Sequence, residues 1–151
     1  MRSLPCLPTL LLLATTVNAV SLDDLRWQRR LVIAHGGDAR ERAAFESLVA
    51  EEACRLADRD IDVYLVGESE VRPLSAAAAP LDSGAAAALA ALADRSGGGD
   101  AHADGLGLTL IGKDGGVKRR ADGAAALADF FEAVDGMPMR RAEIDRRDDP
   151  C

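Results

Sequence analysis

The sequence contains little cysteine, histidine, lysine or aromatic residue. Its 151 residues include 3 cysteines and 2 histidines, and aromatic residues make up 3%. Three cysteines are too few for a disulfide-rich scaffold, and two histidines restrict any zinc site. The lysines are Lys113 and Lys118, and the other basic residues are arginines. Acidic residues are in excess, with a net charge of −7, so we expect no nucleic-acid partner.

The sequence also lacks an apolar run long enough to span a bilayer. Residues 7–17 form an apolar run of eleven after a short cationic start, whereas a membrane-spanning helix needs roughly 20 apolar residues. Small residues surround Ala19 and Val20, so residues 1–19 are predicted to be a signal peptide cleaved between these two. We expect a periplasmic or secreted protein without a stable membrane span. An uncleaved anchor or a buried helix is the alternative.

Cleavage after Ala19 would leave Cys54 and Cys151. An oxidising compartment permits a disulfide between them. Cys54 falls on a predicted helix, however, and Cys151 ends a charged tail over residues 144–151, so we favour two unpaired thiols.

Residues 21–27 predict a short capped turn or helix, because Ser21 and Asp24 are close to a capping box. The rest of the first half of the predicted domain reads as strand, helix and strand. Residues 31–35 are a continuous apolar run, which indicates a strand buried on both faces. Residues 38–56 predict one helix, because Asp38 and Glu41 match a capping box and apolar residues recur every three or four positions. Residues 61–66 predict a second strand, parallel to the first because a helix connects them.

The second half predicts a helix, a hairpin and a last helix. Residues 82–94 form an alanine-rich helical segment. Residues 106–111 and 117–119 flank the dipeptide Asp114-Gly115, which is a strong hairpin signal when both residues take positive φ. Residues 122–135 predict the last helix.

This order predicts an α/β fold. A β-α-β unit, a helix, a β-hairpin and a C-terminal helix would form a mixed four-stranded sheet in the thioredoxin-like arrangement. The domain would span residues 21–143, between the signal peptide and the tail.

Thioredoxin-like enzymes hold a reactive cysteine where the first strand meets the first helix, and this sequence has none there. A thiolate at that junction is stabilised by the helix N-terminus. The junction here reads His35-Gly36-Gly37-Asp38, and Cys54 falls near the opposite end of the helix. A histidine that ends an apolar strand is more often structural than a general base. We therefore predict no catalytic residue and no cofactor.

Three stretches imitate known ligand loops and are rejected. Residues 107–114 nearly match a phosphate-binding loop but lack its final Ser/Thr and a following helix. Residues 58–69 lack the Gly and Glu that a calcium loop needs at positions six and twelve. Residues 100–104 offer two aspartates and a histidine with no fourth ligand nearby. No metal site is predicted.

Charged residues mark the predicted hairpin and the segment after the last helix. Lys113, Asp114 and Lys118 belong to the hairpin, and Arg140 follows a Met-Pro-Met segment. These four residues could form a binding surface on an otherwise acidic protein, and a solvated hairpin face is the alternative.

Three stretches resemble a known family: residues 22–32, residues 110–118 and residues 135–143. They are similar to a bacterial family of secreted domains of unknown function (DUF 4174), related to a domain of animal extracellular matrix proteins that carry sushi repeats. The resemblance implies a secreted, thioredoxin-like domain without an established activity.

Two functions fit these observations. The favoured one is a binding module without a redox cysteine, which uses Lys113, Asp114, Lys118 and Arg140 to contact a partner such as another protein. The alternative is an antioxidant enzyme that reduces peroxide or disulfides through Cys54.

Overall fold

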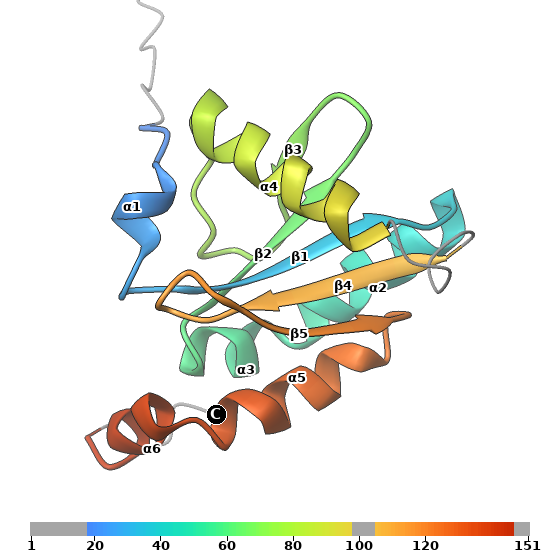
Figure 1. Ribbon diagram of the computed structural model, residues 1–151. Coiled ribbons are helices and arrows are strands. Elements are labelled where there is room, and N and C mark those ends of the chain that lie inside the picture. The colour runs from blue at the N-terminus through green and yellow to red at the C-terminus, as the bar shows by residue number, and fades with distance from the viewer. Residues whose placement is uncertain (1–17, 98–104, 147–151) are drawn as a thin grey trace, which may run out of the picture.

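A computed structural model describes residues 18–97 and 105–146 (Figure 1). The predicted signal peptide and the end of the predicted tail lie outside these ranges. The elements in chain order are α1 (Leu22–Leu25), β1 (Arg30–Gly36), α2 (Ala39–Glu51), α3 (Ala53–Asp58), β2 (Ile61–Val66), β3 (Val71–Pro73), α4 (Ser83–Gly97), β4 (Leu106–Ile111), β5 (Val117–Asp122), α5 (Ala126–Asp135) and α6 (Pro138–Ile144).

The strands form one mixed sheet in the order β3-β2-β1-β4-β5. β1 runs parallel to β2 and antiparallel to β4, and the edge strands β3 and β5 are antiparallel to their neighbours. The sheet therefore has five strands, and the prediction of four was wrong. β3 is three residues long, which is too short to show an alternating pattern. It ends in proline, which is tolerated because the strand lies at an edge of the sheet.

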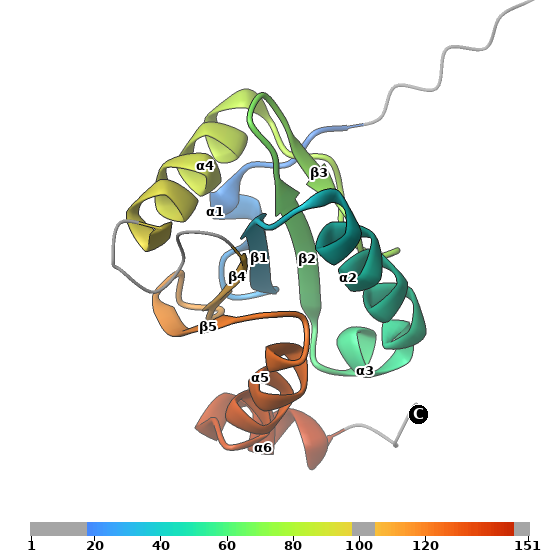
Figure 2. The ribbon, with the colours of Figure 1, turned by 90° about the vertical axis from the view of Figure 1, so that its right-hand side faces the viewer.

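Helices cover both faces of the sheet (Figure 2). α2, α3 and α5 pack against one face, where the core includes Phe45, Phe130 and Phe131. α1 and α4 cover the other face, whose smaller core contains Leu89 and Ala93 from α4. Because α4 is rich in alanine, its side chains fill less space on this second face than the phenylalanines fill on the first.

The two predicted helix starts are confirmed as capping boxes. The Ser21 hydroxyl accepts from the Asp24 N–H at 3.2 Å, and the Asp24 carboxylate accepts from the Ser21 N–H at 3.0 Å. The Asp38 and Glu41 side chains make the equivalent reciprocal pair, at 2.8 Å in each direction. Each box satisfies backbone donors that a helix start leaves unpaired.

The helices differ in three respects from those that we predicted. The helix expected over residues 38–56 is divided at Glu52 into α2 and α3. β5 continues to Asp122, so α5 begins at Ala126 instead of residue 122. A further helix, α6, was not predicted, although it begins with Pro138 at a position that favours helix starts.

The hairpin between β4 and β5 turns through a longer loop than predicted. The Gly112 carbonyl accepts from the Gly115 N–H at 2.9 Å, and the Gly116 carbonyl accepts from the Gly112 N–H at 2.9 Å. Of the dipeptide Asp114-Gly115, only Gly115 has a positive φ, at 82°. This pattern is typical of a three-residue loop with glycine in the left-handed position, so the expected two-residue turn was wrong.

The fold includes the residue that follows the predicted cleavage point. The Val20 N–H donates to the Pro80 carbonyl at 2.9 Å, and the Val20 carbonyl accepts from the Asp82 N–H at 2.9 Å. Val20 is therefore held against the segment that leads into α4. Among the helices of the described ranges, none has the length and apolar character needed to cross a membrane.

Candidate functional site

The junction between β1 and α2 is built from glycines. Gly36 and Gly37 have φ of 68° and 69°, a left-handed conformation that favours glycine. A Cβ on Gly36 would lie 2.8 Å from the Gly105 carbonyl oxygen. A Cβ on Gly107 would lie 2.5 Å from the His35 imidazole, so the ring rests on the backbone of β4. These contacts give the junction a structural role, and no cysteine of the described ranges lies at it.

Cys54 lies away from this junction. It is exposed on α3, and α2, which is 13 residues long, lies between the two places, a helix length of about 20 Å. Cys54 is disulfide-bonded, and its partner lies outside the described residues. The expectation of an unpaired thiol at Cys54 was therefore wrong, because an exposed helix surface leaves a thiol accessible to another segment.

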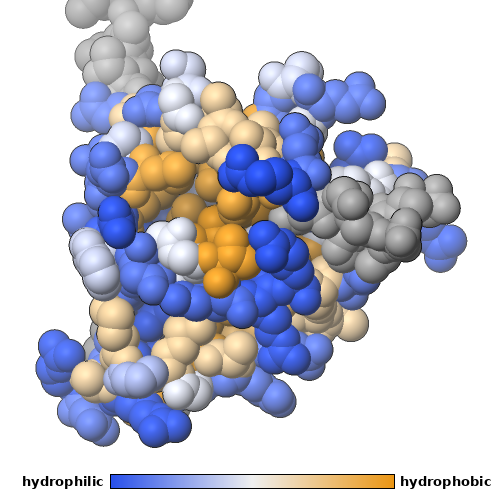
Figure 3. All heavy atoms as spheres, viewed as in Figure 1, coloured by the Kyte–Doolittle hydropathy of each residue, from blue (hydrophilic) through white to orange (hydrophobic). Residues whose placement is uncertain are grey.

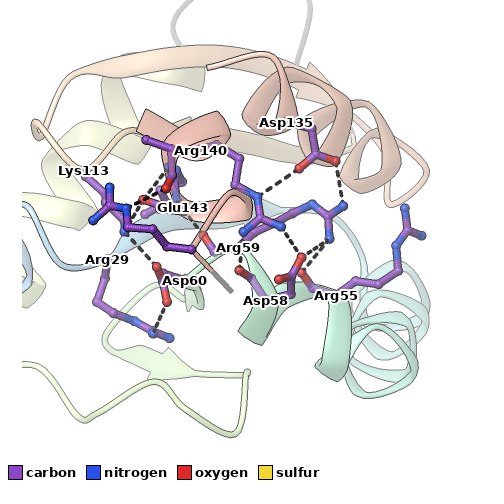
Figure 4. Close-up of polar contacts among 12 residues, drawn as sticks. Arg29, Arg55, Asp58, Arg59, Asp60, Lys113, Asp135, Arg140 and Glu143 are labelled. Carbon is purple, nitrogen blue, oxygen red and sulfur yellow. Dashed lines mark hydrogen bonds and ion pairs between the residues drawn. The ribbon is translucent and has the colours of Figure 1, made fainter. Parts of the chain in front are cut away.

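The opposite end of β1 carries six interacting charges, which we call the sheet-end cluster: Arg29, Arg30, Asp60, Asp62, Lys113 and Glu143. The Lys113 ammonium lies 2.8 Å from Asp60 and 2.7 Å from Glu143 (Figure 4). Arg30 donates to the two Glu143 carboxylate oxygens at 3.0 and 3.3 Å. The cluster contains three bases and three acids, so its formal charges balance.

A second group of charges, the helix-end cluster, consists of Asp58, Arg59, Asp135 and Arg140. The Arg140 guanidinium pairs with the Asp58 carboxylate and donates to the Asp58 carbonyl at 2.7 Å. It also donates to Asp135 at 3.3 Å, and Arg59 donates to the same carboxylate at 2.7 Å. The two clusters together attach α6 to the end of the sheet (Figure 4).

The clusters lower the pKa values of two carboxyl groups, Glu143 and Asp135. Burial alone would raise each pKa, but hydrogen bonds and charge from the two bases that each group contacts outweigh burial. Both carboxyl groups therefore remain ionised in the folded protein at a pH where free carboxyl groups take up protons.

We expect the protein to lose stability in acid. In the unfolded chain Glu143 and Asp135 take up protons near 4.5 and 3.8, whereas the folded protein binds them only at lower pH. Their contribution is thus complete above about pH 5 and is lost as pH falls through this range. Urea unfolding from about pH 7 to about pH 3 measures the effect, and Glu143→Gln should flatten the profile. A wild-type profile that is flat or rises toward acid would contradict this.

Of the four predicted surface residues, the structure buries two and leaves two at the surface. Lys113 and Arg140 are buried, with 8% and 3% of their surface exposed, and both serve in the clusters. Lys118 and Asp114 lie at the surface and pair with each other at 2.6 Å. Sequence reasoning could not separate the buried pair from the exposed one, because the ion-pair partners are remote in sequence.

Three of the four residues line one pocket of about 340 Å³, which we call the Trp27 pocket. Lys113, Asp114 and Lys118 form one side of it, and Arg140 does not line it. The remaining lining residues are Trp27, Arg30, Gly112, Met137, Pro138 and Met139. The hairpin and the Met-Pro-Met segment therefore meet in space, as a binding surface built from both requires.

Sequence reasoning did not select Trp27. Its side chain is 58% exposed, and its φ of 67° is rare for a bulky residue. The Trp27 N–H donates to the Lys113 carbonyl at 2.6 Å, which holds this conformation against the hairpin. The one available signal was that this is the single tryptophan of the chain.

A second hollow lies on the other side of the hairpin turn. It has a volume of about 350 Å³ and is bordered by α1, α4 and the turn itself. Gly112, Lys113 and Asp114 line both hollows, so the turn separates them. His35 lines neither of these two hollows.

The aspartates of the rejected calcium-like stretch form ion pairs instead. Asp58, Asp60 and Asp62 each pair with a base of the two clusters. Within residues 18–97 and 105–146, no group of three or more His, Cys, Asp or Glu side chains is arranged to hold a metal ion. Residues 100–104 lie outside the described ranges.

Comparison with known proteins gives a family and no activity. The sequence matches the family described as Domain of unknown function (DUF4174) over residues 21–143. No curated protein and no solved structure matches the chain. The match includes Trp27, the hairpin and the Met-Pro-Met segment, which line the Trp27 pocket. The chain therefore belongs to the DUF4174 family of domains of unknown function.

Proposed function

We propose that this protein is a secreted binding module with a thioredoxin-like fold and no catalytic thiol. The order of β2, β1, β4 and β5, with one parallel and two antiparallel pairings, supports this fold. Placement of α2 and α5 on one face and α4 on the other supports it as well. Secretion is supported by the leader-like residues 1–19 and by the anchoring of Val20 in the fold.

The binding role rests on one observation, the exposure of apolar side chains around the Trp27 pocket. Trp27 is 58% exposed and Met139 is 44% exposed, and both line the hollow. Large exposed apolar side chains beside a concave surface mark contact sites, and tryptophan is enriched where binding energy is concentrated. The strained backbone of Trp27 fits this role, since such conformations cluster at functional sites.

The lining favours a protein segment as the partner. Met137 and Met139 adapt to varied shapes, and Trp27 offers a flat apolar face. Lys118 also lines the pocket, but its charge is balanced by Asp114. A partner segment with an exposed apolar side chain would match this lining.

A capture experiment tests this function. The wild-type protein and the variants Trp27→Ala and Met139→Ser each carry a photo-crosslinker and are placed in the cell fraction where the protein resides. The amount of crosslinked partner is then compared. We expect at least about a tenfold loss of the crosslinked partner in both variants, because truncating a buried anchor residue removes roughly 1.4 kcal/mol or more. Ile144→Ser is the matched control for Met139→Ser. Ile144 is also on α6 and is 47% exposed, but it does not line the pocket.

The same preparation distinguishes this function from a thiol enzyme. A binding module should neither consume peroxide nor reduce a disulfide-bonded peptide. Turnover that disappears in Cys54→Ala would favour the enzyme instead, and equal crosslinking by wild type, Trp27→Ala and Met139→Ser would contradict the proposed site.

A further inference from the structure

The hollow between α1, α4 and the hairpin turn, here called the α4 pocket, has an apolar floor. Six residues form it: Leu22, Leu25, Leu31, Leu89, Leu92 and Ile111. Figure 3 shows an apolar area on this face between α1 and α4, bordered by hydrophilic side chains. An open apolar hollow of about 350 Å³ falls at the small end of ligand pockets, which span roughly 300–1,000 Å³.

One small side chain of α4, Ala88, leaves part of the hollow open. Ala88 lines the pocket, and Leu89 and Leu92 lie deeper. A leucine at position 88 would extend into the space that alanine leaves empty. A small residue at position 88 therefore helps to keep the pocket open.

Arginines rather than acids dominate the edge of the α4 pocket. Arg29 and Lys113 line it, but the acids of the sheet-end cluster balance their charges. Arg26 stacks on Trp27 at 5.7 Å, and Arg95 makes no ion pair with the described residues.

Two acids also line the pocket edge. Asp114 is neutralised by Lys118, which leaves Asp23 against Arg26 and Arg95. The remaining edge charge is thus about one positive unit, on a protein whose overall charge is −7.

We propose that the α4 pocket binds a small amphipathic monocarboxylate, with its apolar part on the leucine floor and its carboxylate toward Arg26 and Arg95. The apolar floor selects for a hydrocarbon group, and the single excess positive charge selects for one carboxylate. The volume favours a medium-length chain or a ring over a long lipid. This inference is independent of the Trp27 pocket and its partner.

The proposal can be tested with octanoate as the probe. Amide chemical shifts of the isotope-labelled protein are followed during titration with octanoate, with octan-1-ol, and with octylammonium. We expect saturable shifts at α1, α4 and the end of β4 with octanoate, with a Kd on the order of 1 mM, because one short chain is buried against the cost of association. Octanol should bind several-fold more weakly, and octylammonium more weakly still.

Two pairs of variants connect the shifts to the pocket. Ala88→Leu fills the hollow and should abolish saturable binding, whereas Ala87→Leu changes a neighbouring exposed alanine that does not line it and should leave the Kd unchanged. Arg95→Gln should weaken octanoate binding by roughly threefold to fivefold and leave octanol binding unchanged. Met139→Ser, which alters a residue that lines only the other pocket, should retain octanoate binding.

Specific outcomes would overturn the proposal. The pocket is excluded if octanoate produces no saturable shifts, or if Ala87→Leu and Ala88→Leu reduce binding equally. Selection for a carboxylate is excluded if octanol binds as tightly as octanoate, or if Arg95→Gln changes neither.

Discussion

Replacing Glu143 with alanine is expected to destabilise the protein by about 3–5 kcal/mol, the usual cost of removing one partner of a buried ion pair. The Glu143 side chain is 12% exposed, and its partners Arg30 and Lys113 are 1% and 8% exposed. Without this carboxylate, the Arg30 side chain keeps its hydrogen bond to the Arg59 carbonyl at 2.7 Å, and Lys113 keeps its ion pair with Asp60. The acids that remain nearby would then not balance the charges of the two buried cations, Arg30 and Lys113.

Urea unfolding at neutral pH measures this loss. Glu132→Ala is the matched control, because Glu132 is an exposed glutamate on α5 outside both clusters, and such surface changes usually stay within about 0.5 kcal/mol. Glu143→Gln should fall between the two, since an amide oxygen can still accept a hydrogen bond but carries no charge. Equal stability of Glu143→Ala and Glu132→Ala would show that the sheet-end cluster does not hold α6.

Replacing Arg140 with methionine is the second change with a large expected effect, again about 3–5 kcal/mol. The side chain of Arg140 is 4% exposed and contacts Asp135 together with the carboxylate and carbonyl of Asp58. Methionine keeps much of the volume and favours helix, so the loss would come from the carboxylates that lose their partner rather than from a cavity.

Two further variants isolate the contribution of the guanidinium. Arg140→Lys keeps the charge but has a single ammonium in place of a fork of donors, so it should recover only part of the stability. Arg141→Met changes the next residue, which is exposed, and should shift stability by less than about 0.5 kcal/mol. A full recovery by lysine would show that charge alone matters, and a similar loss in Arg141→Met would point to helix propensity.

The sequence was most informative where structure depends on neighbouring residues. Both capping boxes could be predicted, because a helix start is satisfied by side chains three residues apart. The strands of the parallel unit and the first strand of the hairpin were found from their apolar runs. The edge strand β3 and the helix α6 were missed because they are short, so each depends on its neighbours more than on its own pattern.

The candidate site also contains features that depend on distant contacts and could not be predicted from the sequence. The hairpin and the Met-Pro-Met segment were selected from sequence, and they do meet at the Trp27 pocket. That Lys113 and Arg140 are buried could not be predicted, because their partners Asp60 and Asp58 lie 53 and 82 residues away. A charged residue is usually solvated, and only a folded chain can supply the acids that make burial tolerable.

The amino-acid sequence alone determined the order of the main strands and helices, the two helix caps, and the lack of cysteine at the start of α2. These features follow from short-range patterns in the chain. The tertiary structure alone decided which charges are buried, which edge strand completes the sheet, and where hollows form beside the hairpin turn. These depend on contacts between distant segments, whose energies no local pattern records.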